Sequence, residues 1–166
     1  MAGDIKTKYP ASNADTTALT ITLTGLATSS TLVAGRESTA VSNTTNVDED
    51  HLVSGKVTVG TSPTGGRIEL WAYAPISIAS GTPSYGKVTG SDAAATFDSR
   101  NQLLSSMRPI WSTAVDTTSD RTYFIPPTSI REAFGELPPL WGLVLVHSSG
   151  VSLNATASNH ALHYSR

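Results

Sequence analysis

Residues 140–146 read LWGLVLV, seven positions without a charged or polar side chain. A short continuous apolar run of this kind is typical of a strand that is covered on both faces. We therefore place a buried strand at this point in the chain.

Residues 129–135, just before this strand, read SIREAFG. Glu132 follows Ser129 at the capping-box spacing, and Gly135 is the type of residue that ends a helix. These features predict one short helical turn over 129–135.

Strands are predicted on both sides of this centre. In residues 19–24, leucine and isoleucine alternate with threonine, which is the pattern of a half-buried strand. Similar patterns predict strands at 32–42, 52–59, 67–74, 103–115, 123–125, 152–154 and 160–164. Pro109 favours a sheet edge or a bulge, and Pro126-Pro127 is expected to stop the strand at 123–125.

Two segments lack such a pattern. Residues 75–100 are rich in Ser, Gly, Pro, Thr and Ala and show no strong periodicity, and we expect a long functional or interface loop there. Residues 1–17 are polar, with Ile5 and Tyr9 as apolar anchors, and we expect an N-terminal arm that is ordered only when something docks it.

The predicted fold is an all-β, antiparallel β-sandwich. The chain has 22 Ser and 23 Thr among 166 residues, and these residue types suit strands and turns. About eight short strands separated by turn residues fit a jelly roll best, with an immunoglobulin-like sandwich as the alternative. Residues 18–166 are expected to form this single domain after the 1–17 arm.

Composition excludes several classes of protein. The absence of cysteine rules out disulfides, thiolate zinc sites and iron–sulfur clusters. A net charge of −2 argues against a nucleic-acid partner, which would ask for a basic stripe. No apolar run approaches the roughly 20 residues of a membrane span, so we expect no membrane association and see no signal peptide.

No motif points to a reaction. Residues 81–88 match the spacing of a phosphate loop except that Val88 replaces the final hydroxyl residue, and no helix is expected to follow. Residues 48–51 read DEDH, where a cation site is conceivable but a solvated acidic turn is favoured. His160 and His163 fall on opposite faces of a strand. We expect no catalytic, metal or cofactor site, and no enzyme activity.

Trp71 and Tyr73 stand on the opposite face of the 67–74 strand from Ile68 and Leu70. One interpretation is a strand with both faces buried inside the domain. The other, which we favour slightly, is an aromatic patch that contacts a partner, because aromatic residues are enriched at interface hot spots.

Four segments of the chain resemble a known family: 21–27, 36–46, 133–143 and 159–164, which read ITLTGLA, RESTAVSNTTN, AFGELPPLWGL and NHALHY. They are similar to small structural proteins encoded with the head genes of tailed bacteriophages. The resemblance implies a jelly-roll cement (decoration) protein. Such a protein is bound outside the capsid of the virion and bridges neighbouring major capsid subunits. It implies no catalytic residues.

This resemblance, together with the composition and the aromatic residues of the chain, leads to an expectation about its binding partners. The chain is expected to bind the phage major capsid protein and copies of itself, with a dimer as the first guess. The expected interface residues are Ile5, Lys6, Lys8, Tyr9, Trp71 and Tyr73. The alternative is a carbohydrate- or receptor-binding module of a phage tail, with Trp71 or Trp111 as an exposed platform. A glycan-cleaving enzyme is a weaker third option.

Overall fold

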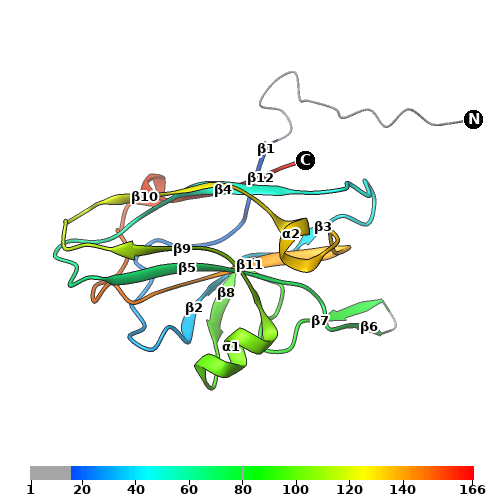
Figure 1. Cartoon of the computed structure of the whole chain (residues 1–166), viewed down its shortest axis with the longest axis horizontal. Helices are drawn as coiled ribbons and strands as arrows, with labels where there is room; N and C mark the ends of the chain where they lie inside the picture. The colour runs from blue at the N-terminus through cyan, green and yellow to red at the C-terminus, as the bar shows by residue number, and fades with distance from the viewer. Residues whose placement is uncertain (1–15, 80) are drawn as a thin grey trace, which may run out of the picture.

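Two antiparallel sheets face each other in the computed structural model, which describes residues 16–79 and 81–166. The four-stranded sheet has the order β1 (Thr16–Ala18), β12 (Ala161–Ser165), β4 (Leu52–Thr58), β10 (Thr122–Ser129). The six-stranded sheet has the order β8 (Ala93–Thr96), β2 (Ala34–Glu37), β11 (Leu140–His147), β5 (Gly66–Tyr73), β9 (Arg108–Val115), with β3 (Val41–Ser42) also paired to β11. In Figure 1 the first sheet lies above the second. The predicted antiparallel β-sandwich is confirmed, and the jelly-roll connection pattern stays a prediction.

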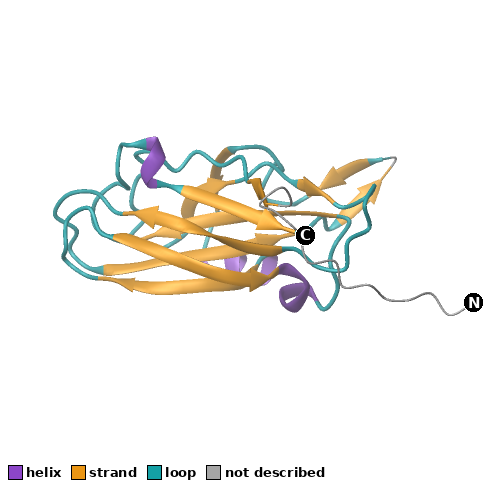
Figure 2. Ribbon diagram, turned by 90° about the horizontal axis from the view of Figure 1, so that it is seen from above, coloured by secondary structure: helices purple, strands orange, loops and turns teal. Residues whose placement is uncertain are grey.

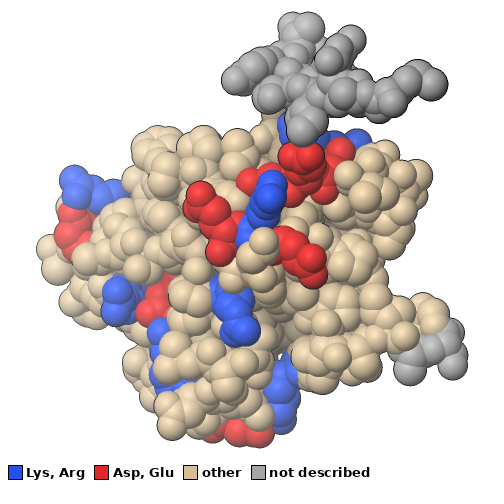
Figure 3. Space-filling view, turned by 45° about the vertical axis from the view of Figure 1, so that its right-hand side comes forward, with Lys and Arg blue, Asp and Glu red and all other residues tan. Residues whose placement is uncertain are grey.

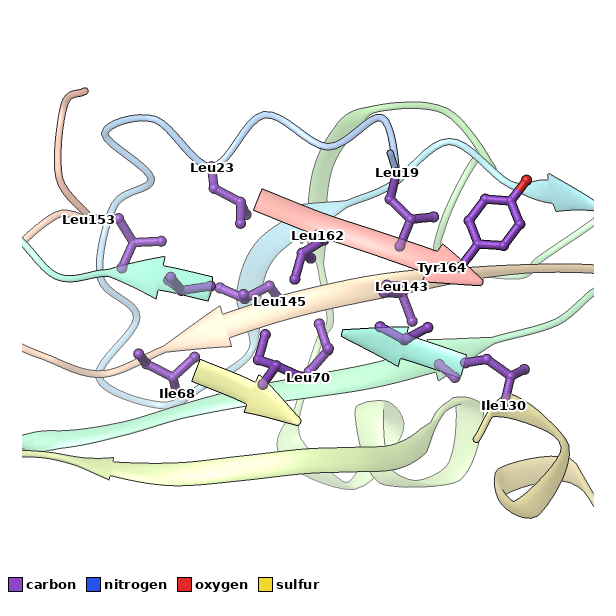
Figure 4. Close-up of a cluster of buried hydrophobic side chains, with 14 of the residues drawn as sticks. Leu19, Leu23, Ile68, Leu70, Ile130, Leu143, Leu145, Leu153, Leu162 and Tyr164 are labelled. Atoms are coloured by element: carbon purple, nitrogen blue, oxygen red, sulfur yellow. The ribbon is translucent and has the colours of Figure 1, made fainter. Parts of the chain in front are cut away.

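The main core fills the space between the two sheets. Apolar side chains of β4, β10 and β12 point toward those of β5 and β11, and Val53, Val57, Leu70 and Leu145 are all fully buried. Leu70 lies opposite Leu145 in the β5–β11 ladder, so both enter the same core layer. Figure 4 shows this cluster between the two sheets. The alternation of apolar and polar residues in β4 and β5 therefore arises because every second side chain enters the core between the two sheets.

A second core covers the other face of the six-stranded sheet. Helix α1 (Arg100–Ser106) and the segment 85–97 pack on β5 and β11, and Phe97, Leu103 and Met107 are among the buried residues. β11 is consequently buried on both faces, as its continuous apolar sequence predicts. Figure 2 shows the layers from above.

Helix α2 (Ile130–Phe134) confirms the predicted helical turn. The Ser129 hydroxyl accepts a hydrogen bond from the Glu132 N–H, and Gly135 adopts the left-handed conformation with φ of 85°. Helix α1 was not predicted, because 103–115 was expected to be one strand. Ser99 caps α1 by accepting the Gln102 N–H, and Leu103 of this helix is fully buried.

Other differences from the sequence expectation concern strand limits. Residues 19–23, predicted to be part of a strand, form none, although Leu19 and Leu23 are buried in the expected alternation. The strand that does form here is β1, whose residues Thr16 and Thr17 had been assigned to the N-terminal arm. β10 continues through Pro126-Pro127 with a register shift between Ile125 and Thr128, because a bulge accommodates residues that cannot donate to the ladder. Residues 152–154 contribute only the bridge of Leu153 to Val59.

The tract 75–100, expected to be a long functional or interface loop, contains strands. It holds β8, which pairs with β2, and the hairpin of β6 (Ser77–Ala79) and β7 (Thr82–Ser84). The remaining short element is the 3₁₀ helix η2 (Ala157–Asn159), which precedes β12. In the described part of the chain, no helix is long and apolar enough to cross a bilayer.

Candidate interaction surfaces

The predicted interface residues fall into two groups. Ile5, Lys6, Lys8 and Tyr9 lie outside the described residues. Trp71 and Tyr73 lie in β5 and are only 4% and 1% exposed, within the second core.

The expectation that Trp71 and Tyr73 contact a partner directly is corrected by this placement. The Tyr73 hydroxyl donates to the Ser38 carbonyl oxygen at 2.7 Å, and burial followed by the nearby Glu37 charge raises the pKa of Tyr73 well above its usual value. The Trp71 indole N–H donates to Glu69 at 3.0 Å, and the Arg100 guanidinium lies over the Trp71 ring. The other interpretation of the sequence, a strand buried on both faces, describes β5 correctly.

A buried carboxylate fixes the tract that covers these aromatics. Glu37 in β2 is completely buried and accepts hydrogen bonds from the backbone N–H groups of Thr89 and Gly90 at 2.8–3.0 Å and from the Thr89 hydroxyl at 3.1 Å. The N–H groups of Thr89 and Gly90, which directly follow the phosphate-loop-like sequence 81–88, therefore already donate to this carboxylate. The arrangement is a structural anchor, in which an internal anion takes the place of an external one.

The acidic turn at 48–51 is also engaged internally. Asp50 accepts hydrogen bonds from the Ser129 hydroxyl and the Arg131 N–H, and so attaches the turn to the start of α2. His51 is buried between Asp48 and Trp141, with its Nε2 3.0 Å from Asp48 and its Nδ1 accepting the Trp141 N–H at 2.9 Å. Within the described ranges, no group of three or more His, Asp or Glu is arranged to hold a metal ion.

The hairpin β6–β7 is an exposed apolar feature. Ile76 and Ile78 are 72% and 50% exposed, and among the strands of residues 16–79 and 81–166, β6 pairs only with β7. In Figure 1 this hairpin projects to the right of the two sheets. Residues 70–86 include no charged side chain, so the edges of the hairpin lack the Lys or Glu that usually prevents pairing with other chains.

A groove lies at the base of this hairpin, with a volume of about 670 Å³. Apolar residues on its wall include Pro75, Ile76 and Phe134, and its charged residues are Lys87 and Arg108. Lys87 is paired with Asp98 at 2.9 Å. Hairpin and groove together form a surface that suits an apolar protein segment better than a small ion, and we call it the hairpin surface.

The outer face of the four-stranded sheet forms a second open surface. Phe124 is 73% exposed, lies opposite Lys56 in the β10–β4 ladder, and shares this face with Leu52. Figure 3 views the two stacked sheets from the side, and on the face it displays the charged side chains gather in small groups with large areas that carry no charge. Scattered apolar residues of this kind are normal, so this face carries less weight than the hairpin surface.

A smaller groove of about 360 Å³ runs along the edge strand β9. Its lining includes Glu69, Trp71, Arg100 and Trp111, and Arg100 contacts Glu69 at 2.6 Å. Trp111 is partly buried, and it packs against the main core. This groove is where the alternative of carbohydrate binding would have to operate.

Comparison of the chain with protein-family models, with curated proteins and with solved structures finds no match. The assignment of a function therefore depends on the sequence and on these surfaces. The β6–β7 hairpin was not predicted; it lies in the tract 75–100, which was expected to be a functional or interface loop, and the charge-free run from 70 to 86 spans the end of β5 and this hairpin.

Proposed function

We propose that this chain is a structural virion protein without enzyme activity, a capsid cement protein on the outer surface of a tailed-phage head. It bridges major capsid subunits and stabilises the shell. The observation that supports this most strongly is the hairpin surface, where two exposed isoleucines stand on an uncharged ribbon held by a rigid sandwich. The resemblance of four sequence segments to phage head proteins supplies the identity of the partner.

The physical requirements of cementing agree with this surface. A shell under internal pressure is held by many modest contacts that are repeated by symmetry, and each contact can be small. An isolated two-stranded hairpin is at best marginally stable in water, so a projecting ribbon gains stability when a partner covers it. Main-chain pairing along its free edges would add hydrogen bonds without requiring charged side chains.

Co-sedimentation with phage heads that lack the protein tests this proposal. The variant Ile76→Ser/Ile78→Ser should fold and bind heads at least about tenfold more weakly, because each exposed isoleucine would otherwise bury apolar surface in the complex. Val47→Ser is the matched control, since Val47 is 75% exposed and lies outside the hairpin surface. Unaltered binding of the hairpin variant would remove this surface from the proposal, and failure of the parent protein to bind any head would reject the function.

A receptor- or carbohydrate-binding role in a phage tail is the second candidate. The β9 groove favours it, because an indole beside a carboxylate and a guanidinium offers both stacking and hydrogen bonding to a sugar. Binding to a glycan array that is lost in Trp111→Ala would support this candidate over the first.

A further inference from the structure

The two strands of the projecting hairpin differ in what their free edges offer to a partner. Ile78 lies directly opposite Pro83 in the β6–β7 ladder. Opposed residues of an antiparallel ladder alternate between pairs that exchange two hydrogen bonds and pairs that exchange none. Because Pro83 has no N–H, its pair with Ile78 is of the second kind. The N–H and C=O groups of Ile78 therefore point away from β7.

The β6 edge of the hairpin is the one that offers both a donor and an acceptor at this position. Among residues 16–79 and 81–166, Ile78 makes no backbone hydrogen bond outside this ladder. On the opposite edge, Pro83 offers a carbonyl oxygen and no donor. Proline and charged side chains are common devices that keep an edge strand from pairing, and β6 contains neither. An extended chain can therefore add to the hairpin on the β6 side.

The groove at the base of the hairpin carries a positive charge that is not neutralised within the described part of the chain. Its lining includes Lys87 and Arg108 but no Asp or Glu. Lys87 is paired with Asp98, whereas exposed Arg108 forms no ion pair with an acidic side chain of the described residues. Ile76, which leads into β6, belongs to the groove wall, so a segment that extends from Ile78 past Ile76 meets this groove.

The chemistry of Arg108 suits a carboxylate. Its guanidinium donates to the Met107 carbonyl oxygen at 3.3 Å, which uses one of its five N–H donors. A guanidinium binds a carboxylate through two parallel hydrogen bonds, an arrangement that needs no further group. The apolar wall beside it, with Pro75 and Phe134, excludes water once the groove is filled and so strengthens such an ion pair.

We propose that the hairpin surface binds an extended, acidic segment of a partner protein. The segment pairs with the N–H and C=O groups of Ile78, covers Ile76 and Ile78 with apolar side chains, and places one carboxylate on Arg108. Backbone pairing selects a peptide as the ligand, and the guanidinium selects an acidic residue. The inference rests on the proposed function, in which this segment belongs to the major capsid protein, and it adds the edge that is used and the charge of the ligand.

Hydrogen exchange of the full chain tests the pairing with β6. The Ile78 amide should exchange at least about tenfold more slowly when the chain is bound to phage heads that lack the protein, because a partner carbonyl then accepts its N–H. The control is the exposed Thr117, in the connection between β9 and β10, which Figure 1 shows at the end of the sandwich opposite the hairpin. Its amide should exchange equally in both states. An Ile78 amide that exchanges at the same rate in the free and bound chain would overturn the inference.

A pair of substitutions separates the backbone contribution from that of the side chain. Ile78→Ala and Ile78→Pro both remove much of the isoleucine side chain, but only proline also removes the N–H. Since that N–H points away from β7, its loss removes no bond of the hairpin ladder. In co-sedimentation with these heads, Ile78→Pro should bind at least about fivefold more weakly than Ile78→Ala, because a partner carbonyl loses its donor. Equal binding of the two variants would contradict the pairing.

Substitutions of Arg108 test the acidic character of the segment without altering the hairpin. Arg108→Gln should weaken head binding at least about fivefold, and Arg108→Glu at least about 30-fold, because glutamate places like charges opposite each other. The matched control Arg121→Gln removes the same charge in the connection between β9 and β10 and should change binding less than about twofold. Equal binding of Arg108→Gln and Arg108→Glu would show that no carboxylate lies there and would overturn the inference.

The possible outcomes distinguish this inference from the proposed function. A parent chain that binds no heads rejects the proposed function and the inference with it. Heads that bind the parent chain, Ile78→Pro and Arg108→Glu equally well reject the inference alone. A parent chain that self-associates in sedimentation analysis, while Arg108→Glu is monomeric, would place a second copy on the hairpin surface and would also overturn the inference.

Discussion

Replacing Glu37 by Gln tests whether a buried carboxylate anchors the tract that covers the six-stranded sheet. Glu37 accepts four hydrogen bonds from Thr89 and Gly90. Glutamine has nearly the same shape, but it presents an NH₂ group where one carboxylate oxygen faced a donor. Hydrogen bonds to a charged group contribute about 1.5–3 kcal/mol each. The lower desolvation cost of an amide offsets part of the loss, so we expect a net destabilisation of about 2 kcal/mol.

Thermal unfolding and hydrogen exchange measure this loss globally and locally. For a chain of this size, 2 kcal/mol corresponds to a decrease in melting temperature of about 4–8 °C. If the covering tract opens locally, the amides of Thr89 and Gly90 should exchange up to about 30-fold faster. Glu136→Gln is the control, because Glu136 is exposed. Melting within about 1 °C of the parent protein, with unchanged exchange at both amides, would refute the anchoring role of Glu37.

Three further predictions concern single residues. Burial lowers the pKa of His147 below 6.5 in the folded state, so the unfolded chain binds the proton first as the pH falls. The free energy of unfolding should therefore decrease as the pH drops through 6.5. Denaturant titrations that show no such decrease in the parent protein relative to His147→Gln would contradict this prediction. Gly142→Ala should cost about 1–3 kcal/mol, because the added methyl group would overlap the buried Tyr73 phenol; an unchanged urea midpoint would be inconsistent with this packing. Calcium or a chelator should leave the melting temperature unchanged, because Asp50 already accepts internal hydrogen bonds, and a shift on chelation would count against that assignment.

Elements whose sequence pattern reflects their own burial or their own local caps could be predicted from the sequence. The apolar run at 140–146 identified β11 because a strand covered on both faces needs no polar positions. The cap residues Ser129 and Gly135 identified α2 for a reason that is entirely local. In contrast, 19–24 has the correct inward and outward positions but no ladder, because alternation reports burial and says nothing about whether a neighbour is close enough to pair.

Features that depend on distant partners could not be predicted in the same way. Trp71 and Tyr73 are buried because the tract 85–107 folds back over β5, and no pattern within 67–74 signals that cover. Helix α1 did carry a local signal, the Ser99 to Gln102 capping spacing, which the apolar residues of 103–115 obscured. The β6–β7 hairpin was missed because the Ser, Gly, Pro, Thr and Ala composition of 75–100 was interpreted as that of a functional or interface loop.

The central claim is that the chain is a component of a phage shell, and its abundance in separated heads and tails tests this most directly. Quantitative mass spectrometry of purified fractions should find the chain in heads, at a fixed ratio to the major capsid protein, and depleted from tails. Its recovery in the tail fraction, or its absence from both particles, would contradict the account.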